Sequence, residues 1–113
     1  MHELSVTQNI IKICTEEANN HDVKVVKSIN LHIGELSGLI PQCIQYYFDI
    51  ASKGTPVQGA KLVIEKIPVE ISCSSCGYNG KLEKGKYSCP VCNSFEVKIT
   101  KGREFMINSM EVD

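Results

Sequence analysis

The sequence has no tryptophan, few aromatic residues and no long apolar run. A helix that crosses a membrane needs about 20 consecutive, mostly apolar residues, so no membrane-spanning segment is predicted. Neither sign of charge dominates, because 12 basic and 13 acidic residues leave a net charge of -1. This balance argues against a protein that holds nucleic acid on a basic surface. The opening Met-His-Glu-Leu-Ser-Val lacks the basic and apolar stretches of a secretory signal, so we expect a cytoplasmic protein.

The residues that are present suffice for one small fold. A chain of 113 residues, 42% of them hydrophobic, can form one compact domain that carries a smaller lobe stabilised by a metal. In a reducing compartment the six cysteines are expected to be thiols or metal ligands and not disulfides. The sequence offers no nucleophile paired with a base and no phosphate-binding loop, so we do not expect an enzyme.

The first half of the chain alternates between helical and extended patterns. Apolar residues recur at helical spacing over 5–18, and a capping-box spacing predicts that this helix begins at Ser5. Alternation over 23–33 predicts a half-buried strand. A second helix is predicted between Pro41 and Gly54, because proline favours a first helical turn and glycine the position past the end. The positions expected to be buried are Val6, Ile10, Ile13, Cys14 and Ala18, then Val25, Ile29, Leu31 and Ile33, then Ile40, Cys43, Ile44, Tyr47, Phe48 and Ala51.

The second half of the chain is extended wherever it is regular. A strand is predicted over 61–71, with a one-residue bulge near Glu65 where its apolar phase changes and an edge position at Pro68. Shorter strands are predicted over 95–99 and 104–112.

This order of elements predicts an α+β fold. Two helices would cover a mainly antiparallel three-stranded sheet in a small two-layer domain, with a zinc-ribbon-like lobe inserted before the last strand. The expected domains are an α/β domain over 1–71 and 103–113, which holds nickel, and a zinc-binding domain over 72–102.

Four of the six cysteines form two close pairs in this lobe. Cys73 and Cys76 are separated from Cys89 and Cys92 by twelve residues, so a short hairpin can bring the four sulfurs to the corners of a tetrahedron around zinc. Four cysteines close the ligand shell, which favours a structural and not a catalytic zinc. The alternatives are two disulfides, which conflict with a reducing compartment, or a redox pair, which normally opens a helix.

The first residues form a second candidate metal site. The α-amino group of Met1 has a reference pKa of about 7.7–8.0 and loses its proton near neutrality. It closes a five-membered chelate ring with the amide nitrogen of His2, and that nitrogen closes a six-membered ring with the imidazole Nδ1. Three nitrogens in one plane suit Ni(II) or Cu(II), and a fourth ligand could come from Glu3 or from a partner. On the residues alone, the alternative is a solvated terminus without a metal.

The remaining sulfur and imidazole groups are not expected to bind metal. Cys14 and Cys43 fall on the apolar faces of the two predicted helices, where a cysteine is usually a small core residue. His21 lies in a polar turn and His32 on the polar face of the first strand, and both are expected to be solvated.

Several motifs together resemble the HypA/HybF family of hydrogenase maturation factors, which are small nickel metallochaperones. They are Met1-His2-Glu3 before a helix, 33–38 (Ile-Gly-Glu-Leu-Ser-Gly), the four paired cysteines and 109–112 (Ser-Met-Glu-Val). The resemblance covers essentially the whole chain in the right order. It implies that His2 is the main nickel ligand, with the Met1 amine and the His2 amide beside it, and that Glu3 is a nickel-site or partner-contact residue.

The resemblance also implies the protein's metals and partners. Ni(II) would be a transferred cargo and Zn(II) a structural ion on the four cysteines. The partners would be the maturation GTPase of the same pathway (HypB) and the hydrogenase large-subunit precursor, with no nucleic acid and no membrane. The alternatives are a zinc ribbon that binds nucleic acid, supported by the three hairpin lysines Lys81, Lys84 and Lys86, and a structural zinc adaptor with an inert N-terminus.

Overall fold

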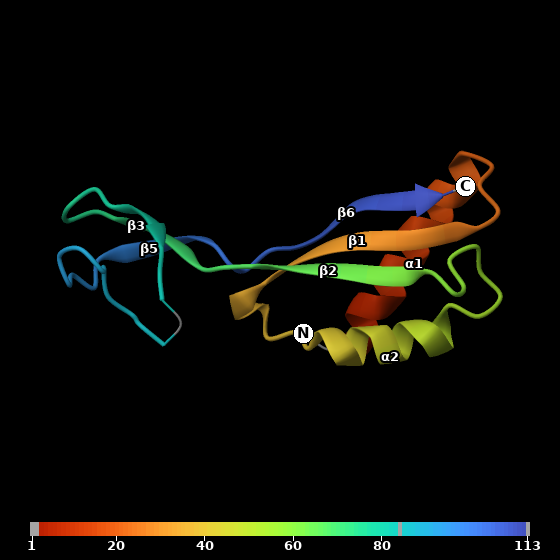
Figure 1. The fold of residues 1–113 in the computed structure, drawn as a ribbon, viewed down its shortest axis with the longest axis horizontal. Coiled ribbons are helices and arrows are strands. Elements are labelled where there is room, and N and C mark those ends of the chain that lie inside the picture. The colour runs from red at the N-terminus through yellow and green to blue at the C-terminus, as the bar shows by residue number, and fades with distance from the viewer. Residues whose placement is uncertain (1–2, 84, 113) are drawn as a thin grey trace. The chain divides into compact units, whose positions relative to one another are not determined.

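The computed structural model describes residues 3–83 and 85–112 (Figure 1). Two three-stranded sheets have the strand orders β2-β1-β6 and β4-β3-β5. The predicted α+β class is therefore confirmed. The elements are α1 (Glu3–Asn20), β1 (Val26–Gly34), the 3-10 turn η1 (Glu35–Ser37), α2 (Pro41–Ala51), β2 (Lys61–Ile67), β3 (Glu70–Cys73), β4 (Asn79–Lys81), β5 (Val97–Lys101) and β6 (Phe105–Val112).

The chain divides into two compact units. The first comprises 1–31, 38–65 and 106–113, and the second comprises 32–37 and 66–105. The second unit is thus larger than the lobe expected from the sequence, because it also takes residues 32–37, 66–71 and 103–105. That each unit folds as an independent domain stays a prediction.

Side-chain pairs fix the direction of β6 beside β1 in the first unit. Ser28 Oγ donates to Glu111 Oε2 at 3.1 Å, and Asn30 Nδ2 donates to Ser109 Oγ at 2.8 Å. As one strand advances by two residues the other retreats by two, which is the register of antiparallel strands. Figure 1 shows β2 running in the same direction as β1, with α2 in the connection between them. Parallel strands need a long crossover of this kind.

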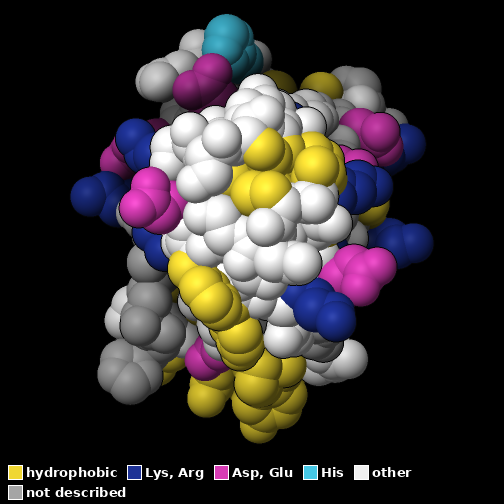
Figure 2. Space-filling model, turned by 90° about the vertical axis from the view of Figure 1, so that its left-hand side faces the viewer, with side chains coloured by type: hydrophobic (Ala, Val, Ile, Leu, Met, Phe, Trp, Pro, Cys, Tyr) yellow, Lys and Arg dark blue, Asp and Glu magenta, His cyan; other side chains and the backbone are white. Residues whose placement is uncertain are grey.

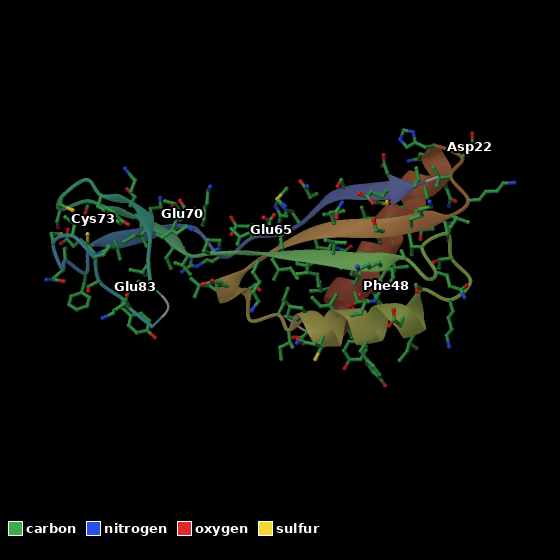
Figure 3. All side chains as sticks on the ribbon, in the orientation of Figure 1. Asp22, Phe48, Glu65, Glu70, Cys73 and Glu83 are labelled. Atoms are coloured by element: carbon green, nitrogen blue, oxygen red, sulfur yellow. The ribbon has the colours of Figure 1, made fainter. Side chains whose placement is uncertain are left out.

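The core of the first unit lies between its sheet and its helices. Phe48 is fully buried and extends from α2 toward the sheet (Figure 3), and α1 packs against α2. Burying side chains of this size is the main favourable term in folding, at about 1.5–3 kcal/mol each. The apolar side chains buried here are Val6, Ile10, Ile11, Cys14, Ala18, Val26, Ile29, Leu31, Leu39, Ile44, Phe48, Val57, Ala60 and Leu62.

The helix boundaries and faces depart from the sequence prediction at several points. Helix α1 begins at Glu3 and not at Ser5, and Ser5 is exposed. The helix includes this earlier turn because the buried Thr7 hydroxyl donates a hydrogen bond to the carbonyl of Glu3. Ile13 is 45% exposed, whereas Ile11 is buried on the face that α1 turns inward. Of the residues predicted to be buried along the second helix, only the central ones, Ile44 and Phe48, are fully buried. The first and last, Ile40 and Ala51, are exposed.

The predicted strands are also corrected at three points. Val25 precedes β1 and is exposed, and the first strand residue, Val26, is buried in its place. The single strand predicted over 61–71 is two strands, because β2 ends at Ile67 and β3 begins in the other sheet. Pro68 lies at the break, where it has no N–H to donate to a strand ladder. Phe95 lies outside β5 and is 78% exposed.

The second unit has a very small core. Strand β3 pairs antiparallel with β4 and with β5. Among the described residues of this unit, the buried apolar side chains are Ile33, Val69, Ile71, Cys73 and Cys89. Three large apolar side chains, Tyr87, Val91 and Phe95, are mostly exposed, and Figure 2 shows apolar patches on the face turned to the viewer. A core this small needs a further source of stability, such as a bound metal.

Among the described residues, no helix is long and apolar enough to cross a bilayer.

Candidate metal centres

Two loops of nearly identical backbone geometry carry the paired cysteines. In the first, the N–H of Gly77 donates to the Cys73 carbonyl at 3.0 Å, and in the second the N–H of Asn93 donates to the Cys89 carbonyl at 2.9 Å. Both turn residues have positive φ, 79° for Gly77 and 63° for Asn93. Glycine and asparagine are the residues that adopt this conformation most readily. The choice of residue after each pair therefore fixes two matching turns, each presenting two sulfurs.

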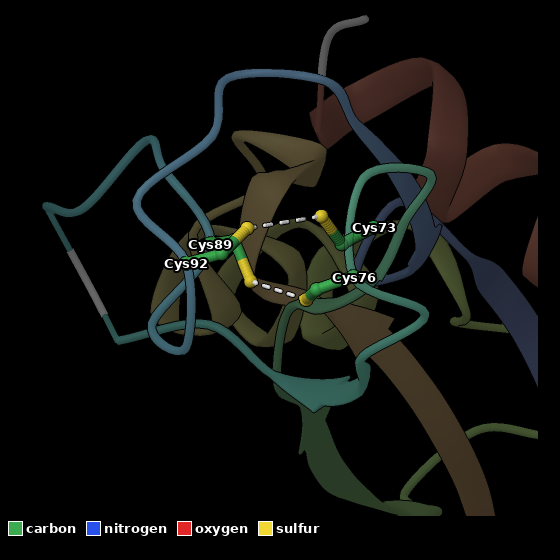
Figure 4. Close-up of side chains that lie close together, drawn as sticks. All are labelled: Cys73, Cys76, Cys89 and Cys92. Atoms are coloured by element: carbon green, nitrogen blue, oxygen red, sulfur yellow. Dashed lines mark hydrogen bonds between the residues drawn. The ribbon is translucent and has the colours of Figure 1, made fainter.

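The two loops face each other and bring their sulfurs together (Figure 4). The Sγ atoms of Cys73 and Cys92 are 3.6 Å apart, as are those of Cys76 and Cys89, and all four lie within 4.8 Å of one another. These are contacts between free thiols and not disulfides, whose sulfurs would be about 2.05 Å apart. Zinc–sulfur bonds of about 2.3 Å place tetrahedral ligands about 3.8 Å apart. The cluster therefore fits a zinc ion with little rearrangement.

The four sulfurs differ in exposure and in acidity. Burial of the Cys89 thiol raises its pKa, but the backbone N–H groups of Cys92 and Val91 outweigh this effect and lower the pKa to about 7. At Cys76 the N–H of Tyr78 lowers the pKa, yet desolvation and the neighbouring thiols raise it to about 12. Because a thiolate and not a thiol binds metal, Cys89 is ready to bind near neutrality, whereas Cys76 must release its proton to solvent as the cation binds.

Hydrogen bonds made by serine hydroxyl groups join the chain segments beside the sulfurs. Ser75 Oγ and Ser94 Oγ lie 2.9 Å apart, and Ser74 Oγ donates to the carbonyl of Glu96 at 3.1 Å. These serines were not predicted from the sequence, because serine beside cysteine carries no distinctive signal. They hold the loops in register and so help to preform the cluster.

The structure places one member of the predicted nickel site. Met1 and His2 lie outside the described residues, so the assignment of nickel to them stays a prediction. Glu3 is in the first turn of α1 and is half-buried. Its carboxylate Oε2 accepts a hydrogen bond from the backbone N–H of Ile40 at 3.2 Å. This partner for Glu3 was not foreseen from the sequence, because it lies 37 residues away.

The two other histidines do not join the cysteine cluster. His21 Nε2 lies 3.0 Å from Glu17 Oε1 on the exposed surface of α1, and His32 is a half-buried residue of β1. Within 3–83 and 85–112, the four cysteines are the only group of three or more potential ligands that could hold a metal ion.

A small α+β unit joined to a four-cysteine lobe defines a class of small metal-binding proteins, and comparison with known proteins identifies the family. The family model described as "Hydrogenase/urease nickel incorporation, metallochaperone, hypA" matches residues 1–112. Hydrogenase maturation factor HypA of Trichodesmium erythraeum is 44% identical over all 113 residues, which cover 96% of that protein. The HypA of Nostoc sp. is 42% identical with the same coverage.

Solved structures agree with these sequence relationships. The solution structure of the Ni metallochaperone HypA from Helicobacter pylori is 29% identical, with a TM-score of 0.71 over 99% of this chain and 97% of that one. A second solution structure of a HypA protein is 30% identical, with a TM-score of 0.75 over 99% and 96% of the two chains. The chain therefore belongs to the HypA family. It is a nickel metallochaperone of hydrogenase maturation, with nickel as its cargo and zinc as its structural metal.

Proposed function

We propose that this chain binds Ni(II) through its first residues and delivers it to a hydrogenase precursor. The ligands are the Met1 amine, the His2 amide nitrogen and the His2 imidazole, and Glu3 is the third residue of the site. The family match from residue 1 to residue 112 is the observation that supports this proposal, because it includes this N-terminal group. Three nitrogens in two fused chelate rings suit Ni(II). A chain end also suits transfer, since a partner can replace its few ligands one at a time.

The structural zinc is assigned to Cys73, Cys76, Cys89 and Cys92. Support comes from the fit of the four Sγ atoms, all within 4.8 Å of one another, to the spacing of tetrahedral thiolate ligands. Zinc would cross-link two loops whose unit has a very small apolar core. Four thiolates leave no open position for a substrate, so the zinc stabilises the fold and takes no part in catalysis. We infer that the chain is not an enzyme.

The partners are proposed at the level of the pathway. Nickel delivery requires a protein that supplies or regulates the metal and a protein that receives it. We take the first to be the maturation GTPase (HypB) and the second to be the hydrogenase large-subunit precursor. Both belong to the cytoplasm, and we place this chain there as well. Neither nucleic acid nor a membrane is a proposed partner.

Nickel calorimetry on zinc-loaded protein tests the terminal site. The native chain is compared with a form that carries one Gly before Met1 and with His2→Ala. The extra residue turns the Met1 amine into an amide and destroys the five-membered ring, so both changes should abolish high-affinity binding. Because binding releases protons from the amine and the amide, affinity should fall steeply between about pH 8 and pH 6.

The matched control is His32→Ala, which removes an imidazole from β1 and should leave nickel affinity unchanged. Equal affinity for the native and the Gly-extended chains would refute the terminal-amine site.

A further inference from the structure

Helix α2 begins without a capping side chain of its own. Its N-cap residue is Ile40, whose apolar side chain makes no cap hydrogen bond, and Pro41 follows at the first helical position. Helix N-termini have unpaired N–H groups and a partial positive charge, which Ser, Thr, Asp or Asn at the N-cap normally satisfy. The backbone N–H of Ile40 is therefore open to an acceptor from elsewhere in the chain.

Glu3 supplies this acceptor from α1. Its Oε2 accepts from the Ile40 N–H at 3.2 Å, so a carboxylate lies beside the positive end of α2. A negative charge in that position is stabilising. The first turns of the two helices are thereby tied together across 37 residues of sequence.

The backbone of Glu3 is held as well. Its carbonyl accepts from the hydroxyl of Thr7 at 2.7 Å, and the Thr7 side chain is fully buried. Glu3 is thus restrained at both its carbonyl and its carboxylate. The residue that directly follows the proposed nickel ligands therefore has a defined position on the surface of the first unit.

We propose that Glu3 is a positioning residue of the nickel site and not a nickel ligand. Through its contact with the Ile40 N–H it fixes the first turn of α1, to which the proposed metal-binding residues are directly joined in the chain. This inference rests on the proposed nickel site at Met1 and His2. It goes beyond that site by separating the role of Glu3 from ligation.

The two roles predict different behaviour for two variants of Glu3. Gln in Glu3→Gln keeps the side-chain length and an acceptor oxygen for the Ile40 N–H, but it is a poor metal ligand. Ala in Glu3→Ala loses both functions. A positioning residue should tolerate Gln, with nickel affinity within about threefold of native, and should lose about tenfold with Ala, as expected for one hydrogen bond to a charged group.

The visible absorption spectrum of the nickel-saturated protein gives a readout that depends on the ligand set. If Glu3 does not ligate nickel, the spectra of the native, Glu3→Gln and Glu3→Ala proteins should coincide at saturation. A changed spectrum in both variants, with equally weakened binding, would show that Glu3 is a ligand and would overturn the inference.

Changing the donor tests the contact without touching Glu3. Ile40→Pro removes the N–H, and Ile40→Ala keeps it as the matched control for loss of the side chain. We expect Ile40→Pro to weaken nickel binding about as much as Glu3→Ala, and the double variant to be no weaker than either single one. Native affinity in folded Ile40→Pro would overturn the inference.

Amide hydrogen exchange keeps the test decisive if Ile40→Pro does not fold. Protection of the Ile40 N–H should fall in Glu3→Ala and persist in Glu3→Gln, and equal protection in both would overturn the inference. His2→Ala separates this inference from the proposed function. If His2→Ala binds nickel like the native chain, the terminal site itself fails, whatever the Glu3 variants show.

Discussion

Gly34 and Gly102 meet through their backbones inside the second unit. A Cβ placed on Gly34 would lie 2.1 Å from the carbonyl oxygen of Gly102, far inside any real contact distance. The same region is joined by hydrogen bonds from the Gly34 N–H to the Glu104 carbonyl and from the Leu36 N–H to the Gly102 carbonyl, each at 2.7 Å. Glycine at position 34 is therefore required by close approach of two chain segments.

Gly34→Ala should accordingly be strongly destabilising. The clash is with backbone, which cannot rotate away as a side chain can, so we expect a loss of about 3 kcal/mol or more in the free energy of unfolding. Denaturant unfolding of the zinc-loaded protein measures the change. Gly38→Ala is the matched control: a Cβ there meets nothing within 4 Å, and only the positive φ of 76° costs about 1 kcal/mol. Equal losses for the two variants would contradict the close contact.

Zinc should be needed for the second unit and not for the first. Purified protein should contain one equivalent of zinc, retained without nickel and released when the thiols are blocked. Cys73→Ser should unfold the second unit and leave much of the first intact, because the core of the first unit is made of other residues. Hydrogen exchange resolved by residue measures both parts.

The control for this experiment is Cys43→Ser, which changes a half-buried cysteine of α2 and should leave the zinc content at one equivalent. If Cys73→Ser unfolds the whole chain in one step, the two units do not fold independently.

Apparent zinc affinity should fall as the pH is lowered. A thiolate and not a thiol binds zinc, so protons compete with the metal for the four cysteine sulfurs. Even Cys89, whose pKa the backbone N–H groups of Cys92 and Val91 lower to about 7 in the folded lobe, is mostly protonated at pH 6. Competition with a chelator of known zinc affinity at pH 8 and pH 6, corrected for the chelator's own protonation, measures the change. Equal zinc affinity at the two pH values would contradict binding through thiolates.

Glu3 should also influence binding of the proposed GTPase partner. Because its carboxylate joins the first turns of α1 and α2, Glu3→Ala should weaken binding of the maturation GTPase several-fold, as judged by surface plasmon resonance at fixed salt. Glu16→Ala removes an exposed acid from the far part of the same helix and serves as the control for charge. If neither variant changes GTPase binding, the joined helix ends are not part of the partner surface.

Local patterns predicted much of this structure because they act over a few residues. The spacing of Cys73, Cys76, Cys89 and Cys92 requires only two tight turns and a hairpin to form a metal cluster. Pro41 and Gly54 bracketed the second helix for steric reasons that do not depend on the rest of the fold. The break between β2 and β3 at Pro68 was harder to predict, because a proline is compatible both with an edge strand and with the end of a strand.

The sequence by itself determined the two helices, the cysteine cluster and the family, because each depends on residue types at short spacing or on motifs along the whole chain. Only the tertiary structure decided that α1 begins at Glu3, that the Glu3 carboxylate lies at the N–H of Ile40, and that Gly34 meets Gly102. The last two of these relationships join residues tens of positions apart. The physical reason is that their partners are backbone groups, which every residue has and which therefore leave no mark in the sequence.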